Sequence, residues 1–486
     1  MKKIMKKLSK AAIVTTLSCA FAVSSVGCGG GNGSDKQSGS SGDNIREEVV
    51  LPDYENMQSR QFIINAWYAP EPTEEAFKAY KECGFNYIFL MGNNVGAAGS
   101  PRIEQALNLC DNLGLKAFVD VSRALPMIDA VIDGYVKHPS FVGFNYDEPV
   151  IYKNSINNAD GIVDIGPVVE KMHKKYPDVE FLVNLNPTTS LSFNWGTPSF
   201  TYEEYLEAQE NYINSVYDGS DVDNWLSCDD YPLYYDPSSK TPYYLKRTWL
   251  QNLEYLAEAK RDSDMKLVTN FFIQTMAYGT NAAKRNRKPS YEDIRLQTYT
   301  LLAFGYDSVS YFCYGTPPTG EEFTETQYGL VDRNGNKTDI YESGKLVNEE
   351  MRRLEKVYMQ FNSRWLGVCP VYGKNNTDKD PDYYNKTMDS MFSPLTVSRL
   401  SGIKEVTSDE DLIIGHMKDE RGNSGFMLVN YNETTLKKQV NAELTFNNFT
   451  KADVYKNGEK TTVSLVGGKL SVHLDTGEGV FVIPHG

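Results

Sequence analysis

Cysteine and histidine are scarce in this chain of 486 residues, which contains seven cysteines and five histidines. Only five cysteines remain after the first 30 residues, at irregular spacing and without a CxxC pair: Cys83, Cys110, Cys228, Cys313 and Cys369. This spacing indicates neither a disulfide framework nor a structural zinc site. The histidines lie outside the ends of the predicted strands, so a histidine-based zinc site or a Ser-His-Asp triad has little support. We therefore expect no metal ion and no other cofactor.

Positive charge is also scarce, because 49 lysines and arginines stand against 64 aspartates and glutamates, and the formal net charge is −15. No basic run follows the first ten residues. Nucleic acids and anionic lipid surfaces are bound mainly through clustered lysine and arginine, so the sequence argues against both as partners. A GxGxxG or phosphate loop is also missing after the first predicted strand, and nucleotide binding therefore has no support.

The first 28 residues predict a lipoprotein signal peptide. Residues 1–10 contain five lysines, residues 11–26 are largely apolar, and small residues precede Cys28. This order is typical of a bacterial secretory signal. The segment Ser25-Val26-Gly27-Cys28 is similar to a lipobox, with serine at the position where leucine is usual. We expect cleavage before Cys28, lipidation of Cys28, and a flexible tether rich in Gly, Ser and Asn over residues 29–54.

This interpretation also predicts where the protein is located. A lipid on Cys28 would hold it on the extracytoplasmic side of a bacterial cell membrane, and the membrane would be contacted only through that anchor. A secreted protein without an anchor is the alternative.

Strand and helix patterns alternate from about residue 60 to 360. Eight apolar or aromatic runs predict strands: 61–70, 85–90, 115–121, 141–149, 180–186, 224–231, 266–274 and 307–314. Helical patterns lie between them, notably at 73–84, 103–114, 241–262 and 291–305. A glycine, which readily adopts the left-handed conformation that ends a helix, separates helix from strand at Gly84, Gly114 and Gly305. Such units predict an α/β fold, a (β/α)8 TIM barrel over residues 55–366, with a doubly wound open sheet as the alternative.

From about residue 367 the pattern changes. Short alternating runs, separated by Asn and Gly turns, follow at 411–418, 425–431, 440–446 and 479–483. This alternation predicts a small all-β antiparallel sandwich over residues 367–486. It contains no polar constellation that suggests chemistry of its own, so we expect it to pack on the barrel through a largely apolar face.

The most informative stretch is FVGFNYDEP, which ends in Asp147, Glu148 and Pro149. Its apolar and aromatic residues predict a strand that is buried on both faces. Pro149 has no N–H for a ladder, so the strand should end there. Asp147 and Glu148 would then lie at the carboxyl-terminal rim of a barrel strand, where the active sites of such barrels are built. We therefore predict that both residues are catalytic.

The other predicted strand ends supply carboxylates, amides, aromatic rings and one arginine. They are Trp67, Tyr68, Asn93, Asn94, Asp120, Arg123, Asn184, Asn186, Asp229, Asp230, Tyr231, Gln274, Tyr311 and Tyr314. Amides and carboxylates hydrogen-bond hydroxyl groups, and aromatic rings stack on the faces of sugars. The set therefore predicts a neutral carbohydrate substrate.

Cleavage of a glycosidic bond needs a carboxylic acid to protonate the leaving oxygen and, as a rule, a second carboxylate. Glu148 is the predicted acid, and Asp229 or Asp230 on the sixth strand is a candidate for the second group. We assign substrate binding to Trp67, Asn184, Asn186, Tyr231, Gln274, Tyr311 and Tyr314.

On these residues the chain resembles the glycoside hydrolases of clan A. In that clan the acid/base glutamate ends the fourth strand and is often followed by proline, as in Glu148-Pro149 here. The segment from Gly329-Leu330-Val331-Asp332 to Asn348-Glu349-Glu350 is similar to the one after strand eight of such enzymes. The resemblance implies a cell-surface hydrolase that cleaves O-glycosidic bonds without a cofactor, with Glu148 as general acid/base.

The seventh strand departs from the clan pattern, because Gln274 stands where the nucleophilic glutamate is expected. The Asp147-Glu148 pair is instead similar to that of β-N-acetylhexosaminidases, in which the acetamido oxygen of the substrate is the nucleophile and the aspartate orients it. Retention or inversion with Asp229 or Asp230, and acetamido assistance with Asp147, all stay open. The alternative from another class is a non-catalytic carbohydrate-binding surface lipoprotein on the same scaffold.

Overall fold

The computed structural model describes residues 50–148, 165–187, 223–239, 241–263, 266–279, 285–320, 322–376 and 388–486. The predicted signal peptide, Cys28 and most of the tether lie outside these ranges. Within them, no helix has the length and apolar character needed to cross a lipid bilayer. Residues 51–486 form one compact unit, in which a barrel and a β-sandwich share a core.

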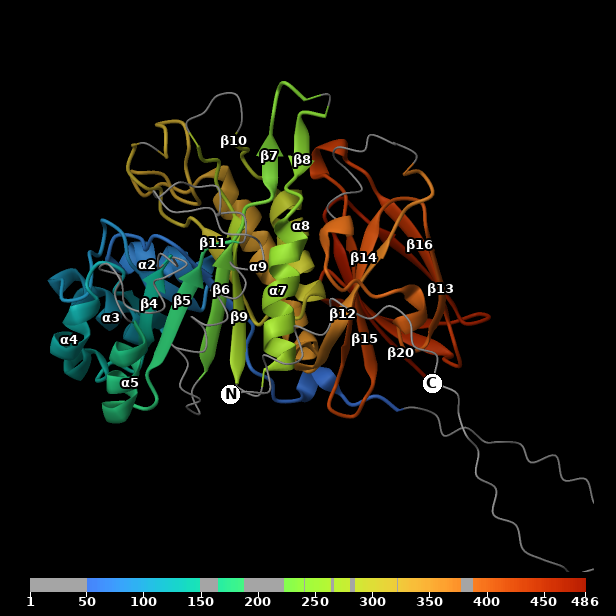
Figure 1. The fold of residues 1–486 in the computed structure, drawn as a ribbon, viewed down its shortest axis with the longest axis horizontal. Helices are drawn as coiled ribbons and strands as arrows, with labels where there is room; N and C mark the ends of the chain where they lie inside the picture. The colour runs from blue at the N-terminus through green and yellow to red at the C-terminus, as the bar shows by residue number, and fades with distance from the viewer. Residues whose placement is uncertain are drawn as a thin grey trace, which may run out of the picture. The chain divides into compact units, whose positions relative to one another are not determined.

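Eight parallel strands form the barrel sheet in the order β1-β11-β9-β6-β5-β4-β3-β2. Figure 1 shows β4, β5 and β6 side by side in this sheet. The strands are β1 (Ile63–Ala66), β2 (Tyr87–Leu90), β3 (Lys116–Asp120), β4 (Phe141–Asp147), β5 (Glu180–Leu185), β6 (Asn224–Asp229), β9 (Leu267–Gln274) and β11 (Ser308–Phe312). Between the two outermost strands of this order, Asn86 N–H donates to Ile64 O (3.1 Å) and Ala69 N–H donates to Met91 O (3.3 Å). These bonds close the sheet, so the predicted barrel is confirmed over the open-sheet alternative.

Helices follow the strands along the chain, as the alternating pattern predicted. They are α2 (Glu74–Glu82), α3 (Pro101–Leu113), α4 (Ile128–Tyr135), α5 (Ile165–Lys175), α7 (Trp249–Asp262), α8 (Tyr291–Ala303) and α9 (Asp339–Tyr358). Gly84, Gly114 and Gly305 have φ angles of 97°, 65° and 73°, the left-handed conformation expected between helix and strand. The predicted start of α2 is also present, because the Thr73 hydroxyl oxygen accepts a hydrogen bond from Ala76 N–H (3.3 Å).

A small antiparallel sheet that the sequence pattern did not predict follows β6. It consists of β7 (Leu233–Tyr235), β8 (Tyr243–Leu245) and β10 (Arg285–Asn286). Figure 1 shows the β7–β8 hairpin projecting beyond the ends of the barrel strands. The predicted helix over 241–262 therefore begins only at Trp249, because the tyrosine-rich start of that segment pairs with β7 instead.

Residues alternate between the outside and the inside of the barrel. Ile64, Val119 and Phe271 point outward into the core that the strands share with the helices. Inward-facing residues form a separate apolar cluster, which includes Phe89, Phe118, Trp225, Val268 and Phe272. Several inward positions are polar and fully or almost fully buried, among them Asn65, Asn184, Ser227, Asn270 and Ser310. The barrel interior thus contains a polar layer among aromatic residues.

Strands after α9 form the predicted antiparallel β-sandwich. They are β12 (Trp365–Val371), β13 (Ile403–Ser408), β14 (Leu412–Lys418), β15 (Ser424–Asn430), β16 (Val440–Phe446), β17 (Lys451–Lys456), β18 (Glu459–Ser464), β19 (Lys469–Leu474) and β20 (Gly479–His485). A six-stranded sheet, β12-β14-β15-β20-β17-β18, faces a three-stranded sheet, β13-β16-β19. Leu428, Leu444 and Val482 belong to the apolar core between them. The switch from barrel to sandwich falls between Tyr358, the last residue of α9, and Trp365.

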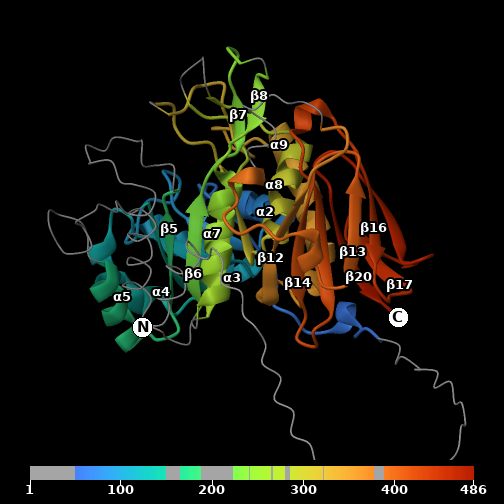
Figure 2. The same ribbon diagram turned by 45° about the vertical axis from the view of Figure 1, so that its right-hand side comes forward.

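The helix α8 lies between the barrel and the six-stranded sheet (Figure 2). Every residue from Asp293 to Ala303 is buried, as expected for a helix covered on both sides. Two glycines of the sheet allow this close approach. A Cβ atom on Gly415 would lie 2.1 Å from Ala303 O, and one on Gly479 would lie 2.3 Å from the Tyr299 ring. The largely apolar contact predicted between sandwich and barrel is therefore present.

Gly415→Ala should destabilise the protein, because the added methyl group collides with the backbone of α8. We expect a loss of about 1–3 kcal/mol in the free energy of unfolding, the usual cost of overpacking. Gly134→Ala is the matched control. A Cβ atom on Gly134, in α4, meets no atom within 4 Å, so the change should be neutral or stabilise the helix by up to about 1 kcal/mol. Equal denaturation midpoints for the two variants would contradict this packing.

Candidate active site

Asp147 is the last residue of β4, and its side chain points into the barrel mouth. Its N–H donates to Ser122 Oγ (2.9 Å), and its Oδ1 accepts a hydrogen bond from Asn184 Nδ2 (3.2 Å) on the neighbouring strand β5. The Ser122 hydroxyl donates in turn to Asp120 Oδ1 (2.5 Å), at the end of β3. Asn184 therefore fixes the Asp147 side chain, and Ser122, just after β3, fixes its backbone.

Glu148 leaves the strand in a left-handed backbone conformation, with a φ angle of 41°. In an extended strand its side chain would point to the helix side, opposite to Asp147. The Glu148 carboxyl group instead forms a hydrogen bond with the side chain of Asp229 on β6. The Glu148 N–H donates to Asn184 O (2.9 Å), so the backbone stays tied to β5. Non-glycine residues seldom adopt this conformation, and those that do gather at functional sites.

Asn184 connects two of the carboxylates. Its Nδ2 donates to Asp147 Oδ1 and to Asp229 Oδ1, each at 3.2 Å. The two hydrogens of one amide group thus reach carboxylates from the strands on either side of β5. Asp147, Glu148 and Asp229 are consequently gathered at one point of the barrel mouth; we call these three residues the carboxylate cluster.

A chain of buried hydrogen bonds fixes the orientation of the Asn184 amide. Ser227 Oγ donates to Asn184 Oδ1 (2.9 Å) and accepts from Asn270 Nδ2 (2.8 Å). Asn270 Oδ1 lies 2.7 Å from Ser310 Oγ, which is also 2.5 Å from Asn65 Oδ1. Because Asn184 Oδ1 is held as an acceptor, its nitrogen must face the carboxylates. The polar layer inside the barrel therefore positions the carboxylate cluster.

Burial and mutual repulsion raise the pKa values of all three carboxyl groups. Burial, followed by the charge of Asp229, raises the pKa of Asp147 well above its usual range. Burial, followed by the charge of Glu148, does the same to the pKa of Asp229. For Glu148, burial and then the charges of Asp147 and Glu322 raise the pKa to about 7. Other residues crowd around the Glu148 carboxyl group, but Glu148 as a whole is exposed. The site therefore opens to solvent.

Asp230 is not brought into the carboxylate cluster. Its side chain is fully buried and forms an ion pair with Lys246. Its Oδ2 also accepts a hydrogen bond from Asn252 Nδ2 (2.7 Å) of α7. Consecutive residues at the end of β6 point in opposite directions, so Asp229 faces the barrel mouth while Asp230 faces the helices. Of the two candidates for the second carboxylate, only Asp229 lies beside Glu148.

Two of the predicted sugar platforms line the inside of the barrel. The Trp67 ring is half-buried and meets Phe272 edge to face, with ring centroids 5.5 Å apart. The Tyr231 ring lies 5.0 Å from Phe312 and 5.3 Å from Tyr278. The charges of Asp229 and Glu148 contribute to the raised pKa of Tyr231, so this ring borders the carboxylate cluster.

Tyr311 and Tyr314 are not at the mouth, which corrects their expected role in substrate binding. Tyr311 is fully buried on the helix side of β11, and its hydroxyl donates to Asn348 Oδ1 (2.7 Å) of α9. Tyr314 packs against Tyr80, with ring centroids 4.7 Å apart, and against Phe85. Tyr311 faces outward because Ser310 and Phe312, its neighbours in the strand, face inward.

Gln274, which was predicted to bind substrate, forms hydrogen bonds with other parts of the protein. Its fully buried Nε2 donates to Arg287 O (2.6 Å), and its Oε1 accepts from Leu233 N–H (3.2 Å) and Asn286 Nδ2 (3.1 Å). The amide thus joins β9 to the small sheet instead of facing a substrate. Asn186 is half-buried and lies just after the end of β5.

Several residues of the mouth and of the polar layer beneath it were not among the predicted site residues: Ser122, Ser227, Asn270, Tyr278 and Phe312. Two of these residues lie inside strands and could have been found from the sequence, because each is a polar residue at an inward position of an otherwise apolar strand. Ser227 and Asn270 both stand at such positions. Tyr278 and Phe312 carry no comparable signal, because aromatic residues are common in the core as well.

No protein-family model matches the chain, and no curated protein matches it either. Its fold is similar to those of solved glycoside hydrolases. These include a β-galactosidase from the psychrophilic Marinomonas ef1, with 13% identity over 60% of each chain and a TM-score of 0.38. A family 39 glycoside hydrolase from Bacteroides cellulosilyticus WH2 has 11% identity over 90% of this chain and 82% of that chain, with a TM-score of 0.45. A GH42 β-galactosidase from G. stearothermophilus has 8% identity over 87% of this chain and 98% of that chain, with a TM-score of 0.44.

The chain spans 60% of the length of the Marinomonas enzyme. At these identities and TM-scores the similarity concerns the fold alone and does not assign the chain to any of these families.

Glu148→Gln should stabilise the protein at pH values above about 7 and have little effect near pH 4. The pKa of Glu148 is raised from the ordinary value of 4.5 to about 7 in the folded state, so the native protein binds this proton more tightly than the unfolded chain. The free energy of unfolding therefore falls as the pH rises through this interval. Glutamine carries no charge, so the difference in Tm between variant and wild type should grow over the same interval and then stay constant.

Thermal melts at several pH values from about 4 to about 8.5 measure this effect. Glu75→Gln, on the exposed face of α2, is the control and should show no such pH-dependent gain. A constant difference between the Glu148→Gln and wild-type melting temperatures would refute the raised pKa.

Proposed function

We propose that this protein is a glycoside hydrolase in which Glu148 is the general acid. The observation that carries the proposal is the hydrogen bond between Glu148, whose pKa is raised to about 7, and Asp229 at the barrel mouth. An acid of near-neutral pKa still holds its proton at working pH and can release it in the transition state. Glycosidic cleavage requires this, because the leaving oxygen must take up a proton as its bond to the anomeric carbon breaks.

Asp229 is the proposed partner of Glu148. Their hydrogen bond brings the two carboxyl groups closer than the roughly 6.5–9.5 Å that leaves room for a water molecule in inverting enzymes. This favours a retaining route. An Asp229 oxygen attacks the anomeric carbon while Glu148 gives its proton to the leaving oxygen. Glu148 then takes a proton from water, whose oxygen displaces Asp229 from the sugar.

The environment of Asp229 supports this division of roles. The Asn184 amide donates to Asp229 Oδ1, and this hydrogen bond stabilises the carboxylate that is released at the end of the cycle. Glu148 and Asp229 titrate as a pair, so a single shared proton provides one acid and one base at neutral pH. Among the described residues, none of the three cluster carboxylates forms an ion pair with a lysine or arginine.

Asp147 supports a second route for substrates that carry an acetamido group. In that route the acetamido oxygen attacks the anomeric carbon, and Asp147 accepts the hydrogen bond of the acetamido N–H. Asp147 is held toward the mouth by Asn184, beside Glu148, as such a role requires. Glu148 remains the acid in both routes.

The surroundings of the cluster favour a neutral sugar. Trp67, Tyr231 and Phe312 offer aromatic faces for stacking, and the carboxylates and Asn184 offer groups for hydroxyl recognition. The overall charge of −15 disfavours strongly anionic glycans.

We also propose that the enzyme is held at the outer side of a bacterial membrane by a lipid on Cys28. The order of basic, apolar and small residues before this cysteine supports the proposal. The protein expressed in a bacterial host should partition with membranes and begin at a modified Cys28, as mass spectrometry of its N-terminal peptide would record. Cys28→Ala should leave the signal uncleaved or release the protein. Cleavage at another site, with all of the protein in the soluble fraction, would argue against the anchor.

Glu148→Gln should lower kcat on substrates with poor leaving groups by about 10²–10⁴-fold. Nitrophenyl glycosides need little protonation, so their glycosylation step should recover much of the loss. Wild-type activity should also fall as the pH rises through about 7, because Glu148 loses its proton there. Screening a panel of nitrophenyl glycosides, followed by pH–rate profiles, measures both effects, with Glu75→Gln as the control. Unimpaired hydrolysis by Glu148→Gln would sink the assignment.

Asp229→Asn and Asp230→Asn separate the two neighbouring carboxylates. Asp229→Asn should abolish turnover while the protein remains folded, and azide should restore activity by attacking the anomeric carbon to give a glycosyl azide. Asp230→Asn should retain kcat per folded molecule but lower Tm, because it breaks a fully buried ion pair. The reverse pattern would show that the second carboxylate is misassigned. Selective turnover of acetamido sugars, lost in Asp147→Asn, would favour the substrate-assisted route.

A further inference from the structure

A pocket of about 650 Å³ lies apart from the carboxylate cluster. Its walls come from the β7–β8 hairpin, the start of α8, the loop after β11 and the short helix η8 (Thr434–Leu436) of the sandwich. None of Asp147, Glu148, Asp229 and Asn184 lines it. Its volume falls within the range of small-molecule and cofactor sites.

The β7–β8 hairpin carries two pairs of tyrosines on opposite faces. Tyr234 and Tyr244 form one cross-strand pair, with ring centroids 5.6 Å apart, and the charge of Tyr234 acts on Tyr278 beside the carboxylate cluster. Side chains alternate along a strand, so the second pair must face the other way. That pair is Tyr235 and Tyr243, with ring centroids 5.1 Å apart, and both residues line the pocket.

The pocket-facing tyrosines form an accessible aromatic surface. Tyr243 is 39% exposed and Tyr235 is half-buried. Among the described residues, no hydrogen-bond partner is found for the hydroxyl group of either tyrosine, and both residues line the pocket. The Arg287 guanidinium lies on one face of Tyr243, with its carbon 6.0 Å from the ring centroid, so that ring is supported from within the protein.

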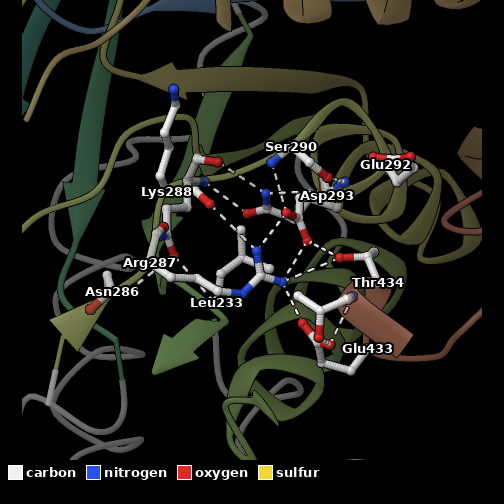
Figure 3. A network of polar contacts seen from close by, with 12 residues as sticks. Leu233, Asn286, Arg287, Lys288, Ser290, Glu292, Asp293, Glu433 and Thr434 are labelled. Atoms are coloured by element: carbon white, nitrogen blue, oxygen red, sulfur yellow. Dashed lines mark hydrogen bonds and ion pairs between the residues drawn. The ribbon is translucent and has the colours of Figure 1, made fainter. Parts of the chain in front are cut away.

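The cations of the pocket are already neutralised. Arg287 donates from Nη1 to Asp293 Oδ2 (2.6 Å) and from Nη2 to Asp293 Oδ1 (2.7 Å). Figure 3 shows the same guanidinium reaching Glu433, whose oxygen lies 2.5 Å from Nη2. Lys288 pairs with Asp339, and Lys437 pairs with Glu292. With each positive charge matched by a carboxylate, the pocket offers no net attraction to an anion.

The amino-terminal end of α8, which faces the pocket, is not an anion site either. The Ser290 side chain accepts from Asp293 N–H (3.3 Å), and the Asp293 carboxylate accepts from Ser290 N–H (2.7 Å). This capping box satisfies two of the donors at the helix start, and the Asp293 carboxylate places a negative charge where a phosphate or a carboxylate would otherwise bind. The remaining chemistry is aromatic faces with hydroxyl groups around them.

We infer that this pocket is a second carbohydrate site, which binds a neutral sugar unit on the Tyr235–Tyr243 pair. Sugar rings present C–H faces to tyrosine, and their hydroxyl groups can reach the side chains of Ser290, Thr326 and Thr435 at the walls. The hairpin would then hold a glycan through one face while its opposite face borders the catalytic mouth. The ligand class rests on the proposed function, but binding at this pocket does not require turnover.

Affinity electrophoresis of the mature protein tests the inference, with gels that contain neutral soluble polysaccharides: hydroxyethyl cellulose, galactomannan, xyloglucan and arabinogalactan. The Glu148→Gln background prevents hydrolysis during the run. We expect at least one polysaccharide to retard this protein, and Tyr243→Ala to weaken that binding about tenfold or more. Tyr372→Ala, at a 44% exposed tyrosine of the sandwich, is the matched control and should bind as before.

Hydrolysis of a small aryl glycoside distinguishes this inference from the proposed function. In the protein that retains Glu148, Tyr243→Ala should leave the rate of this hydrolysis unchanged, because Tyr243 does not border the carboxylate cluster. Retardation that survives Tyr243→Ala but is lost in Trp67→Ala would place all glycan binding at the mouth and overturn the second site. Absence of retardation by every polysaccharide would overturn it as well. Tyr243-dependent retardation without any glycosidase activity would uphold the site and refute the enzyme.

Discussion

The Asn184 amide is the interaction on which the candidate site depends. Its two N–H groups reach Asp147 and Asp229 on the strands to either side. Without these donors, two half-buried carboxylates would repel each other and each would lose a hydrogen bond, which is costly where water is largely excluded. The amide cannot turn around, because Ser227 holds its oxygen, and the polar layer of the barrel holds Ser227 in turn. The geometry at the mouth is thus set by hydrogen bonds deep inside the barrel.

A second constraint acts from outside the barrel. The helix α8 is covered by the barrel on one side and by the six-stranded sheet on the other. Two arginines, one in α8 and one just before it, form ion pairs across that boundary. Arg295 contacts Glu350 of α9 and Glu478 of the sandwich, while Arg287 contacts Asp293 and Glu433. Pairs of this kind stabilise little by themselves, but removal of one partner leaves a buried charge. The sandwich therefore fixes the segment that carries the small sheet beside the mouth.

Much of the fold could be read from periodicity, because strands buried on both faces and glycines between helix and strand leave clear sequence signals. The strand ends of Asp147 and Asp229 could be placed in the same way. The direction of each side chain could not. Asp230 and Tyr311 were expected at the mouth, but a single step in strand register turns each of them toward the helices. Glu148 is the opposite case. Strict alternation would place its side chain outside the barrel, but its left-handed backbone turns the side chain back to the mouth. The β7–β8 hairpin was missed because only pairing with β7 makes residues 243–245 a strand.

The position of α8 also bears on how the chain can fold. β20 follows every barrel element in the sequence, yet it covers the helix that completes the barrel wall. A nascent chain that has emerged only as far as α9 would expose the buried tyrosine and leucine side chains of α8 to water. Barrel and sandwich should therefore gain their stability together, in one cooperative step, and a truncated barrel without the sandwich would be prone to aggregate.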